Sequence, residues 1–435
     1  MRSSAAWVES DVMASFEVVV IGGGPAGMAA AEAACKAGCR SLCILEREGG
    51  LGGVLPQCTH NGFGRRLFRQ DLTGPEYAQR WIERLARLRV EVWPETTVVD
   101  LAPTGKLTAI GPAGVRQVEA GSVVLAVGCR ERTRGELGIP GSRPAGVFTA
   151  GSVQRLMTIP GYLPGREAVI VGSGDIGLIM ARRLALEGVK VRAVVEIMPY
   201  PGGLPNNVAE CLDLDIPLLL EHAVTEVLGS PSLTGVVVAR VDSARKPVPA
   251  TSRILPCDTL LLAAGLVPDN RLALGAGIAL DPATGGPVVS QRRETSVPGI
   301  FACGNGLYVH DLVDEVSRDG QIAGQAAAHH ALQGGTGAPS LTSLRAGQNI
   351  RCLVPQRLTL PKAEPVRISF RVSQPLKSAR LTLRDEDGQP IFTASRRNLA
   401  PAEVSQLSLA EAAVKKIRPG ASLTLEAVSP GDLDG

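Results

Sequence analysis

Residues 16–27 read FEVVVIGGGPAG, and this stretch is the strongest indication of the fold of the chain. A short, mostly apolar run is typical of a β-strand, and three glycines follow it in the spacing GxGxxG. The first glycine permits a tight turn, the second lets the backbone approach a pyrophosphate, and the third lets a helix pack closely on the strand. An Ala-rich helix expected over residues 28–36 completes the unit. The stretch therefore predicts a Rossmann-type dinucleotide-binding domain.

Residues 168–177, AVIVGSGDIG, repeat this pattern. In both copies a second strand ends at an acidic residue, Glu46 in the first and Glu196 in the second. Twenty-four positions separate Gly22 from Glu46, and the same number separate Gly172 from Glu196. A carboxylate at this position can accept hydrogen bonds from a ribose. Because strand, glycines, helix and acid match twice at equal spacing, the sequence predicts two dinucleotide sites.

Glu196 also bears on the choice of nicotinamide cofactor. A carboxylate beside the ribose 2′ position favours a free hydroxyl and repels a 2′-phosphate. Residues 197–200, IMPY, contain no arginine or lysine that could bind such a phosphate. The second copy is therefore expected to bind NAD(H) in preference to NADP(H).

Each copy continues into a β-rich stretch that closes on a small-residue turn, AVG ending at Gly128 and AAG ending at Gly265. Hairpin turns are expected at residues 111–114 and 229–231, and a long helix at residues 311–332. The predicted fold class is α/β, with two Rossmann-like domains, the second inserted in the first. The expected boundaries are a flexible leader at 1–15, a discontinuous first domain at 16–150 and 266–333, an inserted domain at 151–265, a linker at 334–344 and a C-terminal module at 345–435.

The C-terminal module has a different pattern. Between residues 366 and 372, apolar side chains alternate with Arg367, Ser369 and Arg371. Residues 380–384 repeat the alternation before a turn at 385–388. Alternation with a period of two over several short runs is typical of half-buried antiparallel strands. We therefore expect a small all-β module that resembles a sandwich.

Composition excludes several classes of protein. A formal net charge of +3 over 435 residues argues against a nucleic-acid partner. No apolar run reaches the ~18 residues of a membrane span, and the leader lacks the apolar core of a signal peptide. We therefore expect no direct membrane insertion and a cytoplasmic location. The nine cysteines are not expected to form a disulfide framework. Cys35, Cys39 and Cys43 run from helix through turn into strand, so we interpret them as packing residues and predict no metal site.

An ordered set of motifs resembles the two-dinucleotide flavoproteins that are related to the pyridine nucleotide–disulfide oxidoreductases. The set comprises GGGPAG at 22–27, Glu46, the Gly52-Gly53 pair, the AVG turn, GSGDIG at 172–177, the AAG turn and GIFACGN at 299–305. Four longer stretches are similar to the FAD/NAD-linked flavoprotein partners of anaerobic glycerol-3-phosphate dehydrogenases, and more distantly to the flavin subunits of opine oxidase and hydrogen cyanide synthase. These stretches are QCTHNGFG at 57–64, LTGPEY at 72–77, GSGDIGLIMARRL at 172–184 and HDLVD at 310–314. The resemblance covers most of the chain, including the C-terminal β module.

The resemblance implies FAD at the first glycine loop and NAD(P) at the second. The residues implied for FAD are Gly22, Gly24, Ala26, Gly27, Glu46, Gly53, Gly128, Gly304 and Asn305. Those implied for NAD(P) are Gly172, Gly174, Asp175, Ile176, Glu196 and Gly265. The superfamily usually has Gly-Asp where this chain has Gly304-Asn305, so a charge-assisted hydrogen bond to the ribityl chain is lost and FAD is expected to bind a little less tightly.

Two features of the predicted flavin site stay open. The helix expected near Asp311 either aims its positive end at the flavin, where it would stabilise the anionic reduced form, or is an ordinary capped helix. Cys58 is the candidate catalytic residue, because the resemblance places redox-active cysteines of related reductases in this region. No second cysteine stands nearby, so the thiol either reacts alone, as a charge-transfer partner, a sulfenate or a mixed disulfide, or simply packs. His60 is either a proton donor or a hydrogen-bonded structural residue.

Three functions are consistent with these features. The resemblance gives most support to an electron-transfer subunit that works with a separate dehydrogenase. The alternatives are a stand-alone NADH-dependent reductase of a disulfide or small-molecule acceptor using Cys58, and a non-catalytic scaffold whose FAD is structural. The expected partner is a second flavoprotein dehydrogenase subunit or a small redox protein, and a homo-oligomer is a further alternative.

Overall fold

The computed structural model describes residues 13–334, 341–359 and 365–429. The chain divides into two compact units: a first unit, Met1–Cys129 with Pro268–Gly435, and a second unit, Arg130–Val267. Among the described residues, no helix combines the length and the apolar character needed to cross a lipid bilayer.

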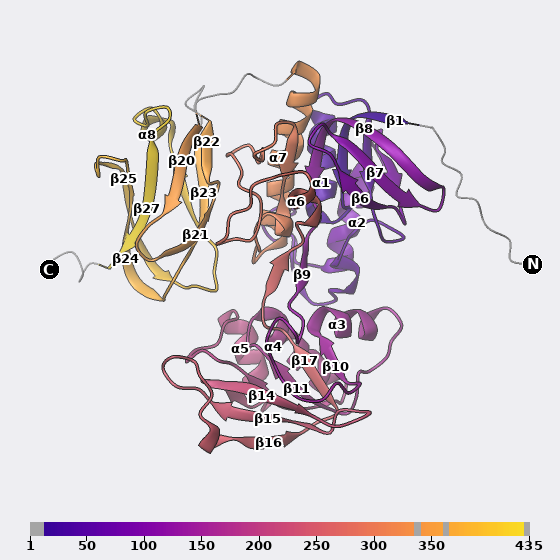
Figure 1. Ribbon diagram of the computed structural model, residues 1–435, viewed down its shortest axis with the longest axis vertical. Coiled ribbons are helices and arrows are strands. Elements are labelled where there is room, and N and C mark those ends of the chain that lie inside the picture. The colour runs from indigo at the N-terminus through magenta and orange to yellow at the C-terminus, as the bar shows by residue number, and fades with distance from the viewer. Residues whose placement is uncertain (1–12, 335–340, 360–364, 430–435) are drawn as a thin grey trace, which may run out of the picture. The chain divides into compact units, whose positions relative to one another are not determined.

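A seven-stranded sheet lies in the first unit, and β1, β6, β7 and β8 are labelled in Figure 1. The apolar run of the glycine motif becomes β1, which lies between β2 and β8 and is parallel to both. Strands β7 and β8 pair antiparallel, which confirms the hairpin predicted at 111–114. The strands of this sheet, in spatial order with β19 also paired to β8, are β5 (Glu91–Trp93), β2 (Leu42–Leu45), β1 (Ala14–Ile21), β8 (Gly114–Leu125), β7 (Lys106–Gly111), β6 (Thr97–Leu101) and β19 (Ile300–Ala302).

Three long or medium helices belong to this part of the first unit: α1 (Pro25–Lys36), α2 (Gly74–Leu85) and α7 (Val313–Gln333). Helices α1 and α7 touch backbone to backbone. A Cβ atom at Gly320 would lie 2.1 Å from the Ala26 carbonyl oxygen, and one at Gly324 would lie 2.0 Å from that of Ala30. Any larger residue at either position would therefore push α7 away from the glycine loop that precedes α1.

The second unit repeats the arrangement of the first. Its parallel sheet has the order β10-β17-β11-β12-β13, so β11 lies between β17 and β12 just as β1 lies between β8 and β2. This topology confirms the internal duplication and the α/β class that the sequence predicts. The elements are β10 (Val147–Thr149), α3 (Ala150–Thr158), β11 (Glu167–Val171), α4 (Asp175–Leu186), β12 (Lys190–Val195), α5 (Pro205–Leu212), β13 (Leu218–Leu219) and β17 (Thr259–Leu262), with an antiparallel sheet of β14 (His222–Leu228), β15 (Gly235–Arg240) and β16 (Arg253–Pro256).

The C-terminal part of the first unit is a β-sandwich. Five strands and three strands form two sheets, and side chains such as Ile368, Phe370, Leu381 and Leu423 are buried between them. Apolar and polar residues alternate along β23 as the period-two pattern predicts. The sheets are β22 (Arg357–Thr359), β20 (Leu341–Ala346), β27 (Ser422–Val428), β24 (Leu376–Arg384) and β25 (Pro390–Leu399), and β21 (Ile350–Val354), β23 (Val366–Val372) and β26 (Ser405–Leu409).

Short elements connect these parts. They are η1 (Leu55–Gln57), β3 (Asn61–Phe63), β4 (Leu72–Thr73), β9 (Cys129–Glu131), η2 (Pro249–Thr251), β18 (Leu266–Pro268), α6 (Arg271–Gly275), η3 (Gly304–Gly306) and α8 (Glu411–Val414). Thr73 and Glu76 form a reciprocal capping box at the start of α2, which fixes where that helix begins.

Candidate functional site

The first glycine loop has no room for larger side chains. Gly22 has φ +102°, and a Cβ there would lie 2.5 Å from the Ala126 carbonyl oxygen. A Cβ at Gly27 would lie 1.8 Å from the Gly22 carbonyl oxygen. Helix α1 starts directly after the N-cap residue Gly24, and no side chain caps it. Its first backbone N–H groups are therefore available to an anion such as a pyrophosphate.

The structure brings the other residues predicted for FAD to the same loop. A Cβ at Gly53 would lie 3.0 Å from the Gly24 Cα atom, and one at Gly304 would lie 2.7 Å from the Ala26 Cβ atom. Gly306, which follows Asn305, lies against Gly128. These segments come from four separate regions of the sequence and converge at the N-terminus of α1.

Both predicted ribose-binding acids also hold their own glycine loops. Glu46 is buried, and it accepts hydrogen bonds from the N–H groups of Gly23 at 2.6 Å and Glu48 at 2.8 Å. Glu196 is buried in the same way and accepts hydrogen bonds from the Ser173 N–H at 2.9 Å and the Ser173 hydroxyl at 2.6 Å. The equal spacing in the two copies therefore has a structural reason. A carboxylate has about four acceptor sites, so each acid can still bind a ribose hydroxyl.

The second glycine loop has the same steric requirement as the first. Gly172 has φ +99°, and a Cβ there would lie 2.5 Å from the Ala263 carbonyl oxygen. Nothing within the described residues lies within 4 Å of a Cβ at Gly174, and no side chain caps α4, but a Cβ at Gly203 would lie 3.1 Å from the Asp175 nitrogen at the start of this helix. Ile176 is 39% exposed beside it. Gly265, φ +101°, follows β17 in the same unit.

Asp175 has a structural role that the sequence did not reveal. Its Oδ1 atom accepts hydrogen bonds from the Leu204 N–H at 2.7 Å and the Asn207 side chain at 2.6 Å. The Ser173 hydroxyl accepts another from the Gly202 N–H at 2.9 Å. Hydrogen bonds thus hold residues 202–207 against the second glycine loop, and the Asp175 carboxylate accepts two of them.

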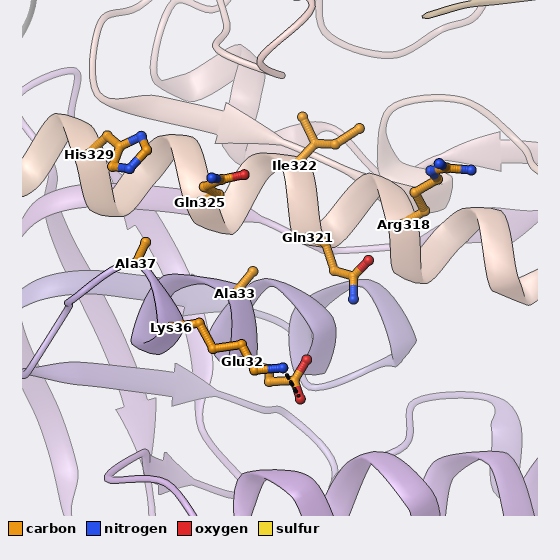
Figure 2. Close-up of a pocket in the computed structure, with 9 residues that line it drawn as sticks. All are labelled: Glu32, Ala33, Lys36, Ala37, Arg318, Gln321, Ile322, Gln325 and His329. Atoms are coloured by element: carbon orange, nitrogen blue, oxygen red, sulfur yellow. Dashed lines mark ion pairs between the residues drawn. The ribbon is translucent and has the colours of Figure 1, made fainter. Parts of the chain in front are cut away.

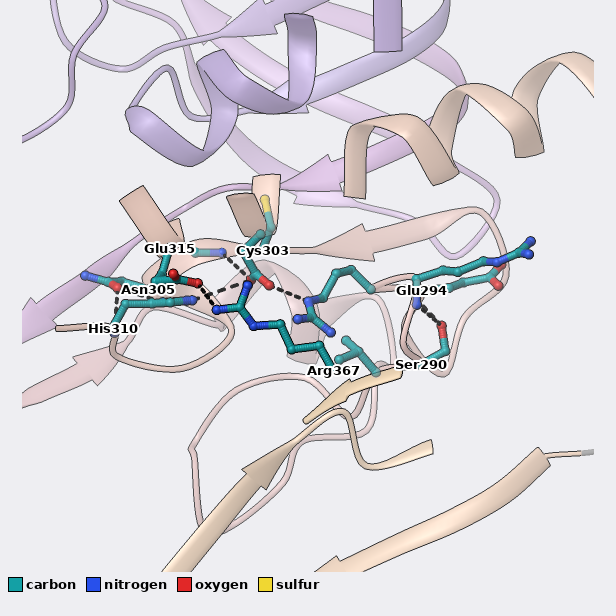
Figure 3. A network of polar contacts seen from close by, with 12 residues as sticks. Ser290, Glu294, Cys303, Asn305, His310, Glu315 and Arg367 are labelled. Carbon is teal, nitrogen blue, oxygen red and sulfur yellow. Dashed lines mark hydrogen bonds and ion pairs between the residues drawn. The ribbon is translucent and has the colours of Figure 1, made fainter. Parts of the chain in front are cut away.

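A buried polar network supports the Gly304–Asn305 turn (Figure 3). Asp319 on α7 accepts a hydrogen bond from the Gly304 N–H at 3.0 Å and forms an ion pair with the buried Arg293. The Asn305 Oδ1 atom accepts a hydrogen bond from the His310 N–H at 3.0 Å. Sequence reasoning missed Asp319 and Arg293, which no motif marks, and it gave no role to His310, although His310 begins the HDLVD stretch at 310–314.

Burial favours the neutral form of His310. Its side chain is 2% exposed, and burial lowers its pKa, although the charge of Asp319, 3.9 Å from Nε2, opposes this effect. The Tyr308 ring covers the imidazole with 4.0 Å between ring centroids. Because the Asn305 oxygen is engaged by His310, the amide nitrogen of Asn305 is the group left to contact a ligand.

Cys58 lies at the end of η1, beside Gly74 of α2. Burial raises the pKa of this thiol to about 11, and its Sγ atom donates a hydrogen bond to the Val54 carbonyl oxygen at 3.3 Å. A thiol with such a pKa is protonated at neutral pH and is a weak nucleophile. The structure favours the packing interpretation. The His60 ring lies 5.1 Å from the Phe63 ring.

The first turn of α7 carries two carboxylates, Asp314 and Glu315. The helix begins at Val313, with Leu312 as an extended N-cap residue, two residues later than the sequence predicts. Acidic side chains in the first turn compensate the positive end of the helix dipole. No side chain caps the helix at Leu312, so both alternatives, an ordinary helix and a dipole directed at the flavin, stay open.

A groove of about 610 Å³ lies between α1 and α7 (Figure 2), and none of its lining residues belongs to the first glycine loop. One side of the groove holds Glu32, whose nearly buried carboxylate pairs with Lys36 at 2.9 Å and with Arg84 at 3.8 Å. The lining residues are Glu32, Ala33, Lys36, Ala37, Arg318, Gln321, Ile322, Gln325 and His329. We interpret it as a surface groove and place the functional site at the glycine loops.

Residues 16–335 match the family described as pyridine nucleotide-disulphide oxidoreductase. The chain belongs to this family. Membership supports binding of FAD and of a pyridine nucleotide, which agrees with two glycine loops that each open a helix. Among the residues that the structure describes, no group of three potential ligand side chains is arranged to hold a metal ion.

This pyridine nucleotide-disulphide oxidoreductase is similar to several known proteins. It is 28% identical over 324 residues to a subunit of opine oxidase from Agrobacterium tumefaciens (strain Ach5), covering 69% of this chain and 63% of the relative. It is 29% identical over 290 residues to hydrogen cyanide synthase subunit HcnB of Pseudomonas protegens, covering 61% and 59%. The chain thus spans less than two thirds of these relatives' lengths. The crystal structure of T. acidophilum thioredoxin reductase shares the fold, with TM-score 0.61 and 23% identity over 73% of this chain and 99% of that one.

Proposed function

We propose that this protein is an FAD-dependent oxidoreductase that transfers hydride between NAD(H) and FAD, as the electron-transfer subunit of a multi-component dehydrogenase of the glycerol-3-phosphate or opine type. The observation that carries the proposal is the duplicated site. Each unit has a glycine loop whose first and third glycines leave no room for a Cβ atom, a helix N-terminus after it that no side chain caps, and a buried acid tied to the loop. Two such sites in one chain suit two dinucleotides.

FAD would bind the first unit. Gly22, Gly24 and Gly27 would hold its pyrophosphate at the start of α1, and Glu46 would accept hydrogen bonds from its adenosine ribose. Gly304 and the Asn305 amide nitrogen would contact the ribityl chain, with Gly53 and Gly128 nearby. We propose residues 16–150 and 266–333 as this FAD-binding domain.

NAD(H) would bind the second unit, in a domain of residues 151–265. Gly172, Gly174 and Ile176 would meet its pyrophosphate, and Gly265 would line the site. The buried Glu196 would accept bonds from the ribose and repel a 2′-phosphate. When bound, the nicotinamide and the flavin supply the hydride chemistry, and the chain supplies their positions and electrostatic surroundings.

The second half-reaction, between the flavin and a reactant other than the nicotinamide, depends on whether Cys58 is reactive. A stand-alone disulfide reductase needs a reactive thiolate, and burial raises the pKa of Cys58 to about 11. This supports the multi-component model, as do two of the relatives, which are subunits of opine oxidase and of hydrogen cyanide synthase. The proposed partner is a separate dehydrogenase subunit that oxidises the substrate.

Turnover by the purified chain tests this choice. The multi-component model predicts that NADH reduces the bound flavin but that no steady turnover follows with small disulfides as acceptors. Steady disulfide reduction that is lost in Cys58→Ser would instead establish the stand-alone reductase. Bound FAD that NADH never reduces would favour the scaffold alternative.

A further inference from the structure

Strand β23 of the C-terminal sandwich has two different faces. Its apolar side chains, including Ile368 and Phe370, are buried in the core of the sandwich. Its polar side chains, Arg367, Ser369 and Arg371, contact the segment that links the Gly304–Asn305 turn to α7. Residues 308–315, called the linking segment below, therefore lie between the proposed FAD site and the sandwich.

Arg371 holds the middle of the linking segment. Its guanidinium donates a hydrogen bond to the Val309 carbonyl oxygen at 3.1 Å and forms an ion pair with Asp311. The Val404 N–H donates to the other Asp311 carboxylate oxygen at 2.5 Å. These contacts flank His310, whose N–H fixes the side chain of Asn305. Arg371 of the sandwich is thus connected to the turn proposed to meet the ribityl chain through two contacts, its bond to Val309 and the bond from His310 to Asn305.

Arg367 holds the end of the linking segment (Figure 3). Its guanidinium donates to Glu315 at 2.7 Å, and Gln406 of β26 donates to the same carboxylate oxygen at 3.0 Å. Arg66, from the loop that follows β3, donates to the other oxygen at 3.0 Å. Burial would raise the pKa of Glu315, but the bond from Gln406 and the neighbouring arginines hold it below its usual range. The carboxylate is therefore ionised and shared between the core and the sandwich.

The two arginines also balance local charge. Asp311, Asp314 and Glu315 place three carboxylates within five positions at the start of α7. Arg367 and Arg371 supply two of the opposing charges, and the Arg367–Glu315 and Arg371–Asp311 pairs are at most a quarter exposed. Partly buried ion pairs of this kind are screened less than surface pairs.

We propose that the C-terminal sandwich is part of the flavin site: Arg367 and Arg371 act as positioning residues that fix the linking segment, and with it Asn305, and offset negative charge beside the flavin. This inference rests on the proposed function, because it takes the Gly304–Asn305 turn to be where FAD binds. The sandwich lies outside residues 16–335, the part of the chain that matches the family, and the inference assigns it a role.

The test compares the double variant Arg367→Gln/Arg371→Gln with a matched control, Arg380→Gln/Arg397→Gln. The control removes two exposed arginines from β24 and β25 of the same sandwich, and neither has an ion-pair partner in the part of the chain that the structure describes. We expect the double variant to bind FAD roughly tenfold more weakly, or ~1.4 kcal/mol. Its flavin midpoint potential should move to a more negative value, because the anionic reduced form loses two compensating charges.

Hydrogen exchange gives a readout that needs no cofactor. Amides of the linking segment should exchange faster in the double variant than in the control or the wild type, since the segment loses its anchors. The single variant Arg371→Lys keeps the charge but loses the fork geometry. In Arg371→Lys the flavin midpoint potential should be close to that of the wild type, while amides of the linking segment should still exchange faster than in the wild type. This variant also serves as the test if the double variant fails to fold.

Two outcomes are distinguishable. If the wild type binds no FAD, the proposed function fails, and the exchange data still report whether the sandwich orders the linking segment. If FAD binds but the double variant matches the control in FAD affinity, potential and exchange, the sandwich is not part of the site and the inference is wrong.

Discussion

Replacement of Asn305 by aspartate should raise the pKa of the buried His310 side chain. In the wild type, Asn305 Oδ1 lies 3.0 Å from the His310 backbone nitrogen and 3.3 Å from Nδ1. Burial lowers the pKa of His310, the charge of Asp319 opposes this, and Arg293 adds to the lowering. Asp311 also raises the pKa of His310. A new carboxylate at position 305 would therefore add the charge that is missing to stabilise the imidazolium.

The size of the effect follows from the contact distance. An opposite charge this close typically raises a pKa by ~1–3 units, equivalent to about 1.4–4 kcal/mol. In the wild type the folded pKa of His310 lies below the unfolded value, so stability falls as the pH drops through the ordinary histidine range. In Asn305→Asp the folded pKa should rise above that of the wild type. The stability gained relative to the wild type is then present at low pH and is lost as the pH rises through the raised folded pKa.

NMR titration of the histidine ring signals measures this directly. The chain has five histidines, and His310→Gln identifies the signal that matters. Asn206→Asp, at an exposed position in the second unit, is the control. One carboxylate oxygen would take the His310 N–H and the other would remain for a ribityl hydroxyl, so FAD should bind more tightly than in the wild type. An unchanged His310 pKa, or an FAD dissociation constant that is no lower, would show that this prediction is wrong.

Three further predictions concern the glycine loops and the thiol. Gly27→Ala should abolish FAD binding and cost at least about 2 kcal/mol of folding free energy, because its Cβ would lie 1.8 Å from the Gly22 carbonyl oxygen. Flavin content and thermal unfolding measure these effects. The control is Gly49→Ala, because no described atom lies within 4 Å of a Cβ at that position. A Gly27→Ala protein that still carries its flavin would contradict the prediction. Glu196→Gln should reduce the preference for NADH over NADPH by roughly tenfold, measured from KM values, and an unchanged preference removes Glu196 from cofactor choice. Cys58→Ser should leave flavin reduction by NADH within about twofold of the wild type, since a partly buried thiol with a pKa of about 11 is protonated, whereas a loss beyond tenfold would show that the thiol takes part.

Local pattern was enough to predict the two Rossmann-like folds. In each copy the apolar strand, the glycines and the helix are contiguous, so the signal lies within a short window. The position of each acid was also visible, but its bond to the second residue of the glycine loop was not. Glu46 bonds to the Gly23 N–H and Glu196 to Ser173, and these contacts explain why the spacing is the same in both copies.

The supporting network of the site could not be predicted, because it depends on packing between distant residues. Arg293 and Asp319 lie on different elements, and only the fold buries them as a pair under Gly304. Asn305 was visible as a departure from the superfamily pattern, but its bond to His310 was not. The period-two pattern of β23 indicated its strand conformation. That pattern could not show that its polar face contacts the segment before α7.

The most direct test of hydride transfer between the two sites is anaerobic stopped-flow absorbance in the flavin band, on the purified chain mixed with NADH and, separately, with NADPH. We expect fast bleaching with NADH and slow bleaching with NADPH, because in the proposed function FAD fills the first site and Glu196 repels the 2′-phosphate at the second. A protein that carries FAD and is bleached by neither nucleotide would rule out hydride transfer between the two sites.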